Sequence, residues 1–210
     1  AGKSTMAKAA AKELGYLYVD TGAIYRTVGY HMWLMGIGPK DADGIRRLID
    51  DVNIVIDHQA DGVQHMILNG MDVTAELRTP EMSRYASGVS AQPCVREYLL
   101  DMQRQFAREH DVVMDGRDIG TVVLPRADVK IFLTASPEER ARRRFEELQA
   151  KGDKSSYAQV LDEKKRDKQD SERDIAPLRP ARDAVKLDTS GNTIEQSVQE
   201  ILEIVRRKLG

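Results

Sequence analysis

The sequence has little of several features that would define a class of protein. Its single cysteine, Cys94, excludes an internal disulfide and suits a reducing, cytoplasmic location. No apolar run approaches the roughly 20 residues of a membrane span. A net charge of −2 gives no overall attraction to nucleic acid or to an anionic membrane, and the four histidines lack the spacing of metal ligands. We therefore expect a soluble protein with neither a nucleic-acid partner nor a membrane partner, whose basic chemistry is local.

The chain opens with the second half of a phosphate-binding loop. The end of the pattern G-x-x-x-x-G-K-[ST] is matched by Gly2, Lys3, Ser4 and Thr5. In such a loop the backbone N–H groups surround the phosphates, the lysine contacts the β- and γ-phosphates, and the next hydroxyl holds Mg²⁺. Residues 6–14 favour a helix and Gly15 suits its C′ position, so the context supports the motif, although short matches also occur in exposed turns. The front of the loop and its buried strand are expected upstream of Ala1.

Four short apolar segments are predicted to be strands of a parallel sheet. They are residues 16–20, 112–115, 129–133 and 184–188. Each is followed by turn or helix signals, and strands that alternate with helical stretches predict βαβ units. The capping-box pair Thr193 and Gln196 predicts a final helix. Ligands of such sheets bind beyond the carboxyl ends of the strands, where we therefore expect the functional residues.

Two stretches interrupt this α/β pattern. Residues 37–110 contain the hairpin signal Asn69-Gly70 and a helical run over residues 95–108, which together indicate an inserted subdomain. Residues 138–183 are rich in charged residues and poor in large apolar side chains. Such a segment buries little core, so we predict mobile helices that cover a site.

Chemically useful side chains follow the first predicted strand. The group is an acid, a hydroxyl, a phenol and a guanidinium, from Asp20, Thr21, Tyr25 and Arg26. A guanidinium grips a phosphate through two hydrogen bonds, which a lysine does less well, so the group favours a phosphorylated second substrate. The alternative is that Tyr25 packs in the core while Arg26 pairs with a surface acid.

A second group, in residues 115–120, follows the second predicted strand. Asp115 can lie near Mg²⁺ or its water, Arg117 can reach a phosphate, and Asp118 can accept hydrogen bonds. The alternative is a turn with an ordinary ion pair. The position of the group, directly after a buried strand, favours a function.

Two further groups lie in the charged stretch. Arg166, Asp170 and Arg173 are spaced i, i+4 and i+7, so two cations bracket one anion on a helical face. An arginine cluster precedes them at Arg140, Arg142, Arg143 and Arg144. Taken alone, both groups are also typical of solvated charge ladders on exposed helices.

Together these motifs resemble the bacterial cytidylate kinases, in the nucleoside monophosphate kinase group of P-loop kinases. The resemblance runs essentially from end to end. It is carried by residues 2–5, 20–26, the hairpin-bearing insert, residues 93–96, residues 115–121, and the helix with Arg166, Asp170 and Arg173. It implies CMP + ATP ⇌ CDP + ADP with Mg²⁺ as cofactor, dCMP as a second acceptor, and a monomer.

The resemblance also implies roles for individual residues. On the ATP side it implies Gly2, Lys3, Ser4, Thr5, Arg140 and Arg143, with Mg²⁺ held directly or through water by Ser4 or Thr5. For CMP it implies Thr21, Tyr25, Arg26, Ser87, Arg96, Arg117, Asp118, Arg166, Asp170 and Arg173. The catalytic set would be Lys3, Asp115, Arg117 and Arg144.

The implied fold is an α/β P-loop kinase core with a five-stranded parallel sheet of order 2-3-1-4-5. Its first strand is the one expected before Ala1. The core would comprise residues 1–36, 111–137 and 184–210, with an NMP-binding insert at 37–110 that carries a small antiparallel sheet, and a helical lid at 138–183. The alternatives are another P-loop small-molecule kinase and a non-catalytic nucleotide-binding protein.

Overall fold

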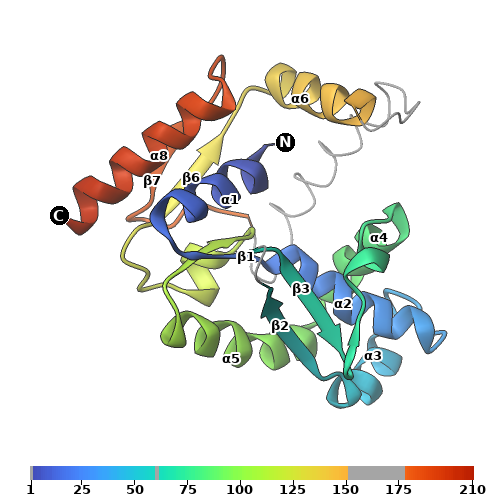
Figure 1. The fold of residues 1–210 in the computed structure, drawn as a ribbon. Helices are drawn as coiled ribbons and strands as arrows, with labels where there is room; N and C mark the ends of the chain where they lie inside the picture. Colours follow the sequence, from blue (N-terminus) through green and yellow to red (C-terminus); the bar gives the residue numbers. More distant parts are fainter. Residues whose placement is uncertain (1, 60–61, 151–177) are drawn as a thin grey trace. The chain divides into compact units, whose positions relative to one another are not determined.

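The computed structural model describes residues 2–59, 62–150 and 178–210 (Figure 1). Two compact units divide the chain. We call them the central unit, Tyr16–Gly116, and the terminal unit, Ala1–Gly15 with Arg117–Gly210.

Over its described residues the central unit contains a parallel strand pair, a small antiparallel sheet, four α-helices and two 3₁₀ helices. Its elements are β1 (Leu17–Asp20), α2 (Thr21–Leu34), α3 (Ala42–Leu48), η1 (Ile49–Asp51), β2 (Ile54–His58), β3 (Gln64–Leu68), β4 (Met71–Asp72), η2 (Thr74–Leu77), α4 (Pro80–Ser90), α5 (Pro93–Glu109) and β5 (Val112–Asp115). β1 and β5 pair in parallel, with Asp20 opposite Asp115 at their carboxyl ends. This register brings two carboxylates to adjacent strand ends.

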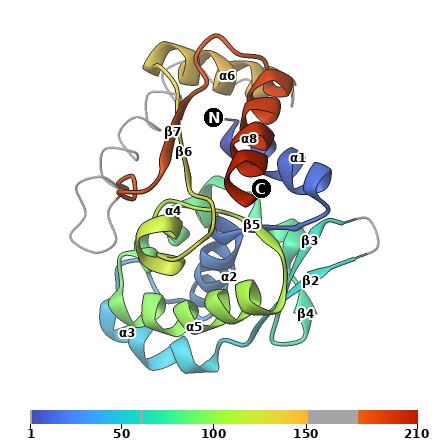
Figure 2. The same ribbon diagram turned by 90° about the vertical axis from the view of Figure 1, so that its left-hand side faces the viewer.

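The antiparallel sheet has the order β2-β3-β4, and its strands lie side by side in Figure 2. Asn69 and Gly70 connect β3 to β4 with φ values of 49° and 85°. Positive φ at both positions is the geometry of a type I′ turn, so the predicted hairpin is confirmed. A second hairpin, β2 with β3, ends in the register pair His58 and Gln64 and was not predicted.

Close helix packing positions α4 in the central unit. Gly29 of α2 lies so near α4 that a Cβ added there would be 2.7 Å from the Cβ of Tyr85. Only glycine allows this approach. The core around it includes the fully buried Val19, Val28 and Leu99, so β1, α2 and α5 share one apolar interior.

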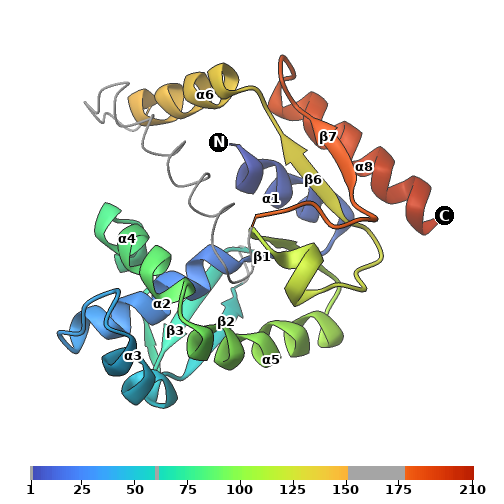
Figure 3. The same ribbon diagram turned by 180° about the vertical axis from the view of Figure 1, so that it is seen from behind.

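The terminal unit is built around a second parallel strand pair. Its elements are α1 (Lys3–Leu14), η3 (Ile119–Val123), β6 (Ile131–Thr134), α6 (Pro137–Ala150), β7 (Val185–Asp188) and α8 (Ile194–Leu209). Figure 3 shows β6 and β7 side by side with α8 along them. The core of this unit joins Met6 and Ala10 of α1 to Leu202 of α8, with Ile131 and Leu187 packed against them.

The four predicted strands are present, with boundaries shifted by at most two residues for three of them and unchanged for β5. The predicted first helix begins earlier, at Lys3, and ends as expected at Gly15, whose φ of 70° is the left-handed C-cap conformation. The capping box of Thr193 and Gln196 is confirmed at α8. The π-helix η3 was not predicted, because a single widened turn leaves no periodic signal.

Candidate active site

The carboxyl ends of β1 and β5 bring several predicted site residues together. The buried hydroxyl of Thr21 donates to the main-chain oxygen of Asp115 at 2.8 Å, which ties the start of α2 to the end of β5. The phenol of Tyr18 donates to the Asp115 carboxylate at 3.3 Å. Asp115 is 7% exposed, and of these two neighbours Tyr18 contacts its carboxylate while Thr21 contacts its main chain. The sequence predicted candidate site residues at these strand ends, and the structure brings Thr21 and Asp115 into contact there.

Asp20 orients Arg26. One oxygen of the Asp20 carboxylate accepts from the backbone N–H of Ala23 at 3.1 Å and caps α2. The other accepts from Arg26 Nη2 at 2.8 Å, with the side chains of Arg26 and Asp20 25% and 30% exposed. A Cβ at Gly22 would lie 3.0 Å from the carboxylate and 3.1 Å from the guanidinium. Tyr25 packs in the core, as the alternative predicted, while Arg26 pairs with a partly buried acid at the start of its own helix rather than with a surface acid.

Arg96 contacts the Tyr25 ring and is linked through Ser90 to the main chain of Ser87 in the central unit. The guanidinium carbon of Arg96 lies 5.5 Å from the centroid of the Tyr25 ring, a cation–π geometry. Arg96 Nε donates to the carbonyl of Ser90 at 2.6 Å, and the Ser90 hydroxyl donates to the carbonyl of Ser87 at 3.1 Å. The end of α4 and the first turn of α5 are thus linked. Ser87 is exposed and the Tyr25 ring is buried, so the polar group that adjoins the ring in this set is the Arg96 guanidinium.

The phosphate-loop residues of the terminal unit lie at the start of α1. Gly2 has φ 87° and ψ −16°, a left-handed conformation, and its carbonyl accepts the first helical hydrogen bond, from Met6 N at 2.9 Å. Lys3 is half-buried, and the hydroxyl residues Ser4 and Thr5 are exposed in the first turn. A helix N-terminus with exposed N–H groups favours anions such as phosphate.

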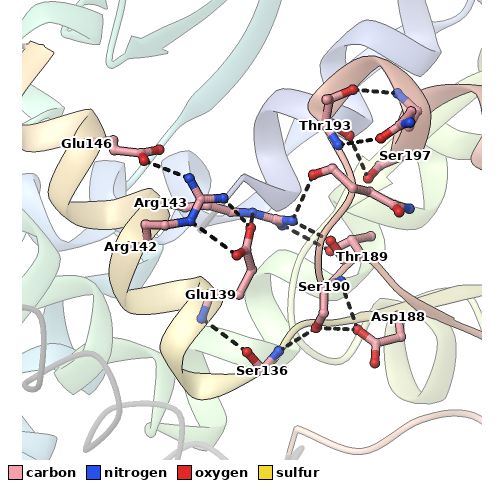
Figure 4. A network of polar contacts seen from close by, with 12 residues as sticks. Ser136, Glu139, Arg142, Arg143, Glu146, Asp188, Thr189, Ser190, Thr193 and Ser197 are labelled. Atoms are coloured by element: carbon pink, nitrogen blue, oxygen red, sulfur yellow. Dashed lines mark hydrogen bonds and ion pairs between the residues drawn. The ribbon is translucent and has the colours of Figure 1, made fainter.

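Arg143 links α6 to the loop between β7 and α8 (Figure 4). Its Nε donates to Glu139 at 2.7 Å, its Nη1 to the Thr189 hydroxyl at 3.0 Å, and its Nη2 to the main-chain oxygen of Thr189. The side chain is 11% exposed. A Cβ at Gly2 would lie 3.9 Å from Arg143 Cδ and Nη1, so this arginine adjoins the phosphate-loop backbone.

The acid of this network is strongly held. Glu139 also accepts from Arg142 Nη2 at 2.7 Å, and Arg142 pairs with Glu146 at 2.6 Å. Hydrogen bonding from Arg142 is the largest cause that lowers the pKa of Glu139, and Arg143 adds to it, while burial acts in the opposite direction. Glu139 therefore stays ionised and keeps Arg143 in place.

The remaining predicted residues are described to different extents. Arg117 is exposed at the start of the 117–120 segment, and Asp118 is 5% exposed, its carbonyl accepting from Val122 N at 2.9 Å. Arg140 lies on α6 and is half-buried. Arg144 is on the same helix, but its side chain is outside the described set. Arg166, Asp170 and Arg173 lie outside the described residues.

Sequence reasoning missed three polar residues next to these groups. Gln64 of β3 hydrogen-bonds both main-chain groups of Asp20, and His58 of β2 contacts the carbonyl of Tyr18 at 2.8 Å. Glu139 and its role in holding Arg143 were also missed. The signal Asn69-Gly70 marks the turn between β3 and β4, and nothing local indicates that the other end of β3 reaches β1.

Over the described part of the chain, none of the helices is both long and apolar enough to cross a membrane. Within the same ranges no three His, Cys, Asp or Glu side chains gather in a way that could hold a metal ion.

Parallel strands followed by helices, with Gly2, Lys3, Ser4 and Thr5 at the start of α1, define a P-loop α/β protein. The family model described as Cytidylate kinase matches residues 1–207. A relative from Caldicellulosiruptor bescii named "Cytidylate kinase" is 50% identical over 97% of this chain and 90% of its own length. Relatives of the same name from Carboxydothermus hydrogenoformans and Desulfitobacterium hafniense are 50% and 49% identical, over 99% and 100% of this chain and 94% and 90% of their own lengths. The chain belongs to the cytidylate kinase family.

Proposed function

We propose that the protein transfers the γ-phosphoryl group of ATP reversibly to CMP or dCMP, giving ADP and CDP or dCDP, in pyrimidine nucleotide metabolism. The observation that carries this proposal is the cluster at the end of β1, where Arg26 is oriented by Asp20 at 2.8 Å and the neighbouring Tyr25 ring is covered by Arg96 at 5.5 Å. A guanidinium suits the phosphate of an acceptor, and an aromatic ring with adjacent polar groups suits its base. Membership of the family and the names of the relatives support the same reaction.

The acceptor nucleotide is assigned mainly to residues of the central unit and of the segment after β5. Arg26 and Arg117 bind the CMP phosphate, and Thr21 and Tyr25 line its site. The base is read by Ser87, Arg96 and Asp118. A site that hydrogen-bonds its substrate rejects the wrong base because the polar groups then lose their partners. Arg166, Asp170 and Arg173, which lie outside the described residues, complete the acceptor site by addressing ribose and phosphate.

ATP is assigned to the start of α1 and to α6. The N–H groups after Gly2 surround the phosphates, Lys3 contacts the β- and γ-phosphates, and Arg140, Arg143 and Arg144 neutralise the charge of the transferring group. The position of Arg143 beside Gly2 supports this assignment. Phosphoryl transfer needs positioning and charge neutralisation more than covalent help, which accounts for the number of arginines.

The residues at the start of α1 fit Mg²⁺ as the cofactor. Magnesium prefers hard oxygen donors and is bound in kinases by one or two protein oxygens together with substrate phosphates. The exposed hydroxyls of Ser4 and Thr5 are donors of this kind. We assign Asp115 to the water shell of the ion. The bound ion supplies neutralisation of the phosphate charge.

The two parallel pairs are assigned to one five-stranded sheet of order 2-3-1-4-5. In that order β1 and β5 are strands two and three, and β6 and β7 are strands four and five. The parallel registers of β1 with β5 and of β6 with β7 support the order. The insert at residues 37–110 and the lid at 138–183 remain the proposed acceptor-binding and closing parts.

The experiment is a measurement of ADP release by the full-length protein with ATP and Mg²⁺. CMP, dCMP, UMP, AMP, GMP and shikimate are supplied separately as acceptors. The highest kcat/KM with CMP or dCMP is expected. A preference for shikimate or another non-nucleotide acceptor would move the protein to a different P-loop kinase, and nucleotide binding without ADP release from any acceptor would make it a non-catalytic binder.

A further inference from the structure

The end of the β2–β3 hairpin formed by His58 and Gln64 hydrogen-bonds to the edge of β1. Gln64 Oε1 accepts from the backbone N–H of Asp20 at 2.7 Å, and Gln64 Nε2 donates to the Asp20 carbonyl at 3.2 Å. His58, the register partner of Gln64, places its Nε2 2.8 Å from the carbonyl of Tyr18. His58 and Gln64, the last register pair of the hairpin, therefore contact the main chain of Tyr18 and of Asp20 along one edge of β1.

The side-chain amide of Gln64 takes the place of a neighbouring strand. Among the described strands, β1 is paired with β5 alone. An amide carries one acceptor and donor hydrogens, so a single glutamine can satisfy both the N–H and the carbonyl of one residue. Gln64 Nε2 also lies 3.1 Å from the sulfur of Met66, which is buried. These contacts fix the rotamer of Gln64 and, through it, the main chain of Asp20.

The fixed main chain controls where Arg26 lies. Asp20 is the last residue of β1 and the N-cap of α2, so its carboxylate position follows directly from its backbone position. That carboxylate receives Arg26 Nη2 at 2.8 Å. A chain of direct contacts therefore runs from Gln64 through Asp20 to Arg26, entirely within the central unit.

We propose that Gln64 is a positioning residue for the acceptor substrate: by clamping the main chain of Asp20, it sets the Asp20 carboxylate that aims Arg26 at the phosphate of the nucleoside monophosphate. This inference rests on the role given to Arg26 under the proposed function. It also assigns a task to the hairpin, whose closed end acts on the acceptor site through the edge of β1.

The first test compares Gln64→Met with His65→Ala. Methionine keeps the length of the side chain but lacks both hydrogen-bonding groups. His65 is the next residue on β3, pairs with Asp72 at 2.7 Å, and points to the other face of the strand, so its removal weakens the hairpin without touching Asp20. Because small misplacements of a binding group cost up to about 100-fold, we expect Gln64→Met to raise the KM for CMP roughly tenfold. We expect an unchanged KM for ATP, and near wild-type values of both constants for His65→Ala.

A pH series with Gln64→Glu separates hydrogen bonding from packing. The ionised glutamate cannot donate to the Asp20 carbonyl, but the protonated acid can, and its ordinary pKa is about 4.3. The KM for CMP of Gln64→Glu relative to wild type is therefore expected to fall as the pH is lowered, because the donor returns. The same ratio for Gln64→Met should not change with pH. The comparison with wild type at each pH removes the titration of the CMP phosphate itself.

A double-mutant cycle with Arg26→Met decides whether Gln64 acts through Arg26. If it does, Gln64→Met raises the KM for CMP in the wild-type background and has no further effect in the Arg26→Met background. Equal effects in both backgrounds would overturn the inference, as would a wild-type KM for Gln64→Met while Arg26→Met is impaired. An unchanged KM for CMP in Arg26→Met itself would instead overturn the role of Arg26 in the proposed function.

Discussion

The two parallel strand pairs share one type of hydrogen bond at their carboxyl ends but differ in the residues beside it. In the central unit, Thr21 follows the last residue of β1 and its hydroxyl donates to the carbonyl of Asp115, the last residue of β5, at 2.8 Å. In the terminal unit, Thr189 follows the last residue of β7, and its hydroxyl donates to the carbonyl of Thr134, the last residue of β6, at 3.1 Å. In each pair a threonine ties one strand end to its neighbour.

The aspartates before these threonines have different tasks. Asp20 caps a 14-residue helix and holds Arg26. Asp188 accepts from the N–H and the hydroxyl of Ser190, at 2.9 and 2.7 Å, and so shapes a turn. The arginine near Thr189 comes instead from α6. The same hydrogen bond between strand ends thus lies beside Arg26, the proposed phosphate ligand, in one unit and beside a loop anchor in the other.

Replacing Asp20 and, separately, Asp188 should give the largest difference in kcat/KM for CMP between the two units. Asp20→Ala removes the partner that orients Arg26, so kcat/KM for CMP is expected to fall about 100-fold. Asp188→Ala, the matched change, should alter it less than about threefold because the lost contacts close an exposed turn. Steady-state kinetics with varied CMP measure both. Similar losses in the two variants would contradict the distinction between the units.

Arg143→Ala against Arg142→Ala sharpens the comparison on the ATP side. Arg143 is 11% exposed and bonded to Thr189, while Arg142 is 55% exposed and, in the network of Figure 4, contacts acids of its own helix. Arg143→Ala is expected to raise the KM for ATP roughly tenfold, since hydrogen bonds from charged groups contribute about 1.5–3 kcal/mol. Arg142→Ala should stay within about twofold. Equal KM values for ATP would remove any special role of Arg143.

Thr21→Val and Thr189→Val test the threonine hydrogen bond that the two strand pairs share. Each removes one hydroxyl-to-carbonyl hydrogen bond, so each should lower the free energy of unfolding by about 1 kcal/mol. Denaturant titration measures that loss. The functional effects should diverge, with the KM for CMP raised in Thr21→Val and unchanged in Thr189→Val. A Thr189→Val variant that weakens CMP as much as Thr21→Val would break the comparison.

The smallest expected effect is on the pH dependence of the free energy of unfolding. All four histidines are in the central unit, and the Nε2 of buried His31 has no hydrogen-bond partner among the described residues. Burial lowers the pKa of His31, and nearby Asp51 opposes this shift. His31 therefore binds a proton more readily in the unfolded chain than in the folded one. The contribution of neutral His31 to the free energy of unfolding is fully present above about pH 6.5 and declines as the pH falls below it. His31→Met should flatten this slope, measured as urea midpoints at pH 7.5 and 5.5, while an unchanged slope would assign it to other groups.

Local signals explain what the sequence predicted. Asn69-Gly70, the box of Thr193 with Gln196, and the left-handed Gly15 each act within a few residues and are present as expected. The clamp of Gln64 on Asp20 joins residues 44 apart and the contact of Arg143 with Thr189 joins residues 46 apart. Such pairs follow from how elements pack, and no local pattern reports them. Motif order identified the residues of the candidate site, but not the neighbours that hold them.

The grip on β1 has a consequence for the behaviour of the protein in concentrated solution. An open strand edge offers N–H and carbonyl groups to any other chain that approaches, which leads to edge-to-edge aggregation. His58 and Gln64 occupy the carbonyl of Tyr18 and both main-chain groups of Asp20 on that edge. Because side chains rather than a further strand take these three positions, they are satisfied without presenting a new edge in their place, and β1 offers fewer backbone groups as a template for association.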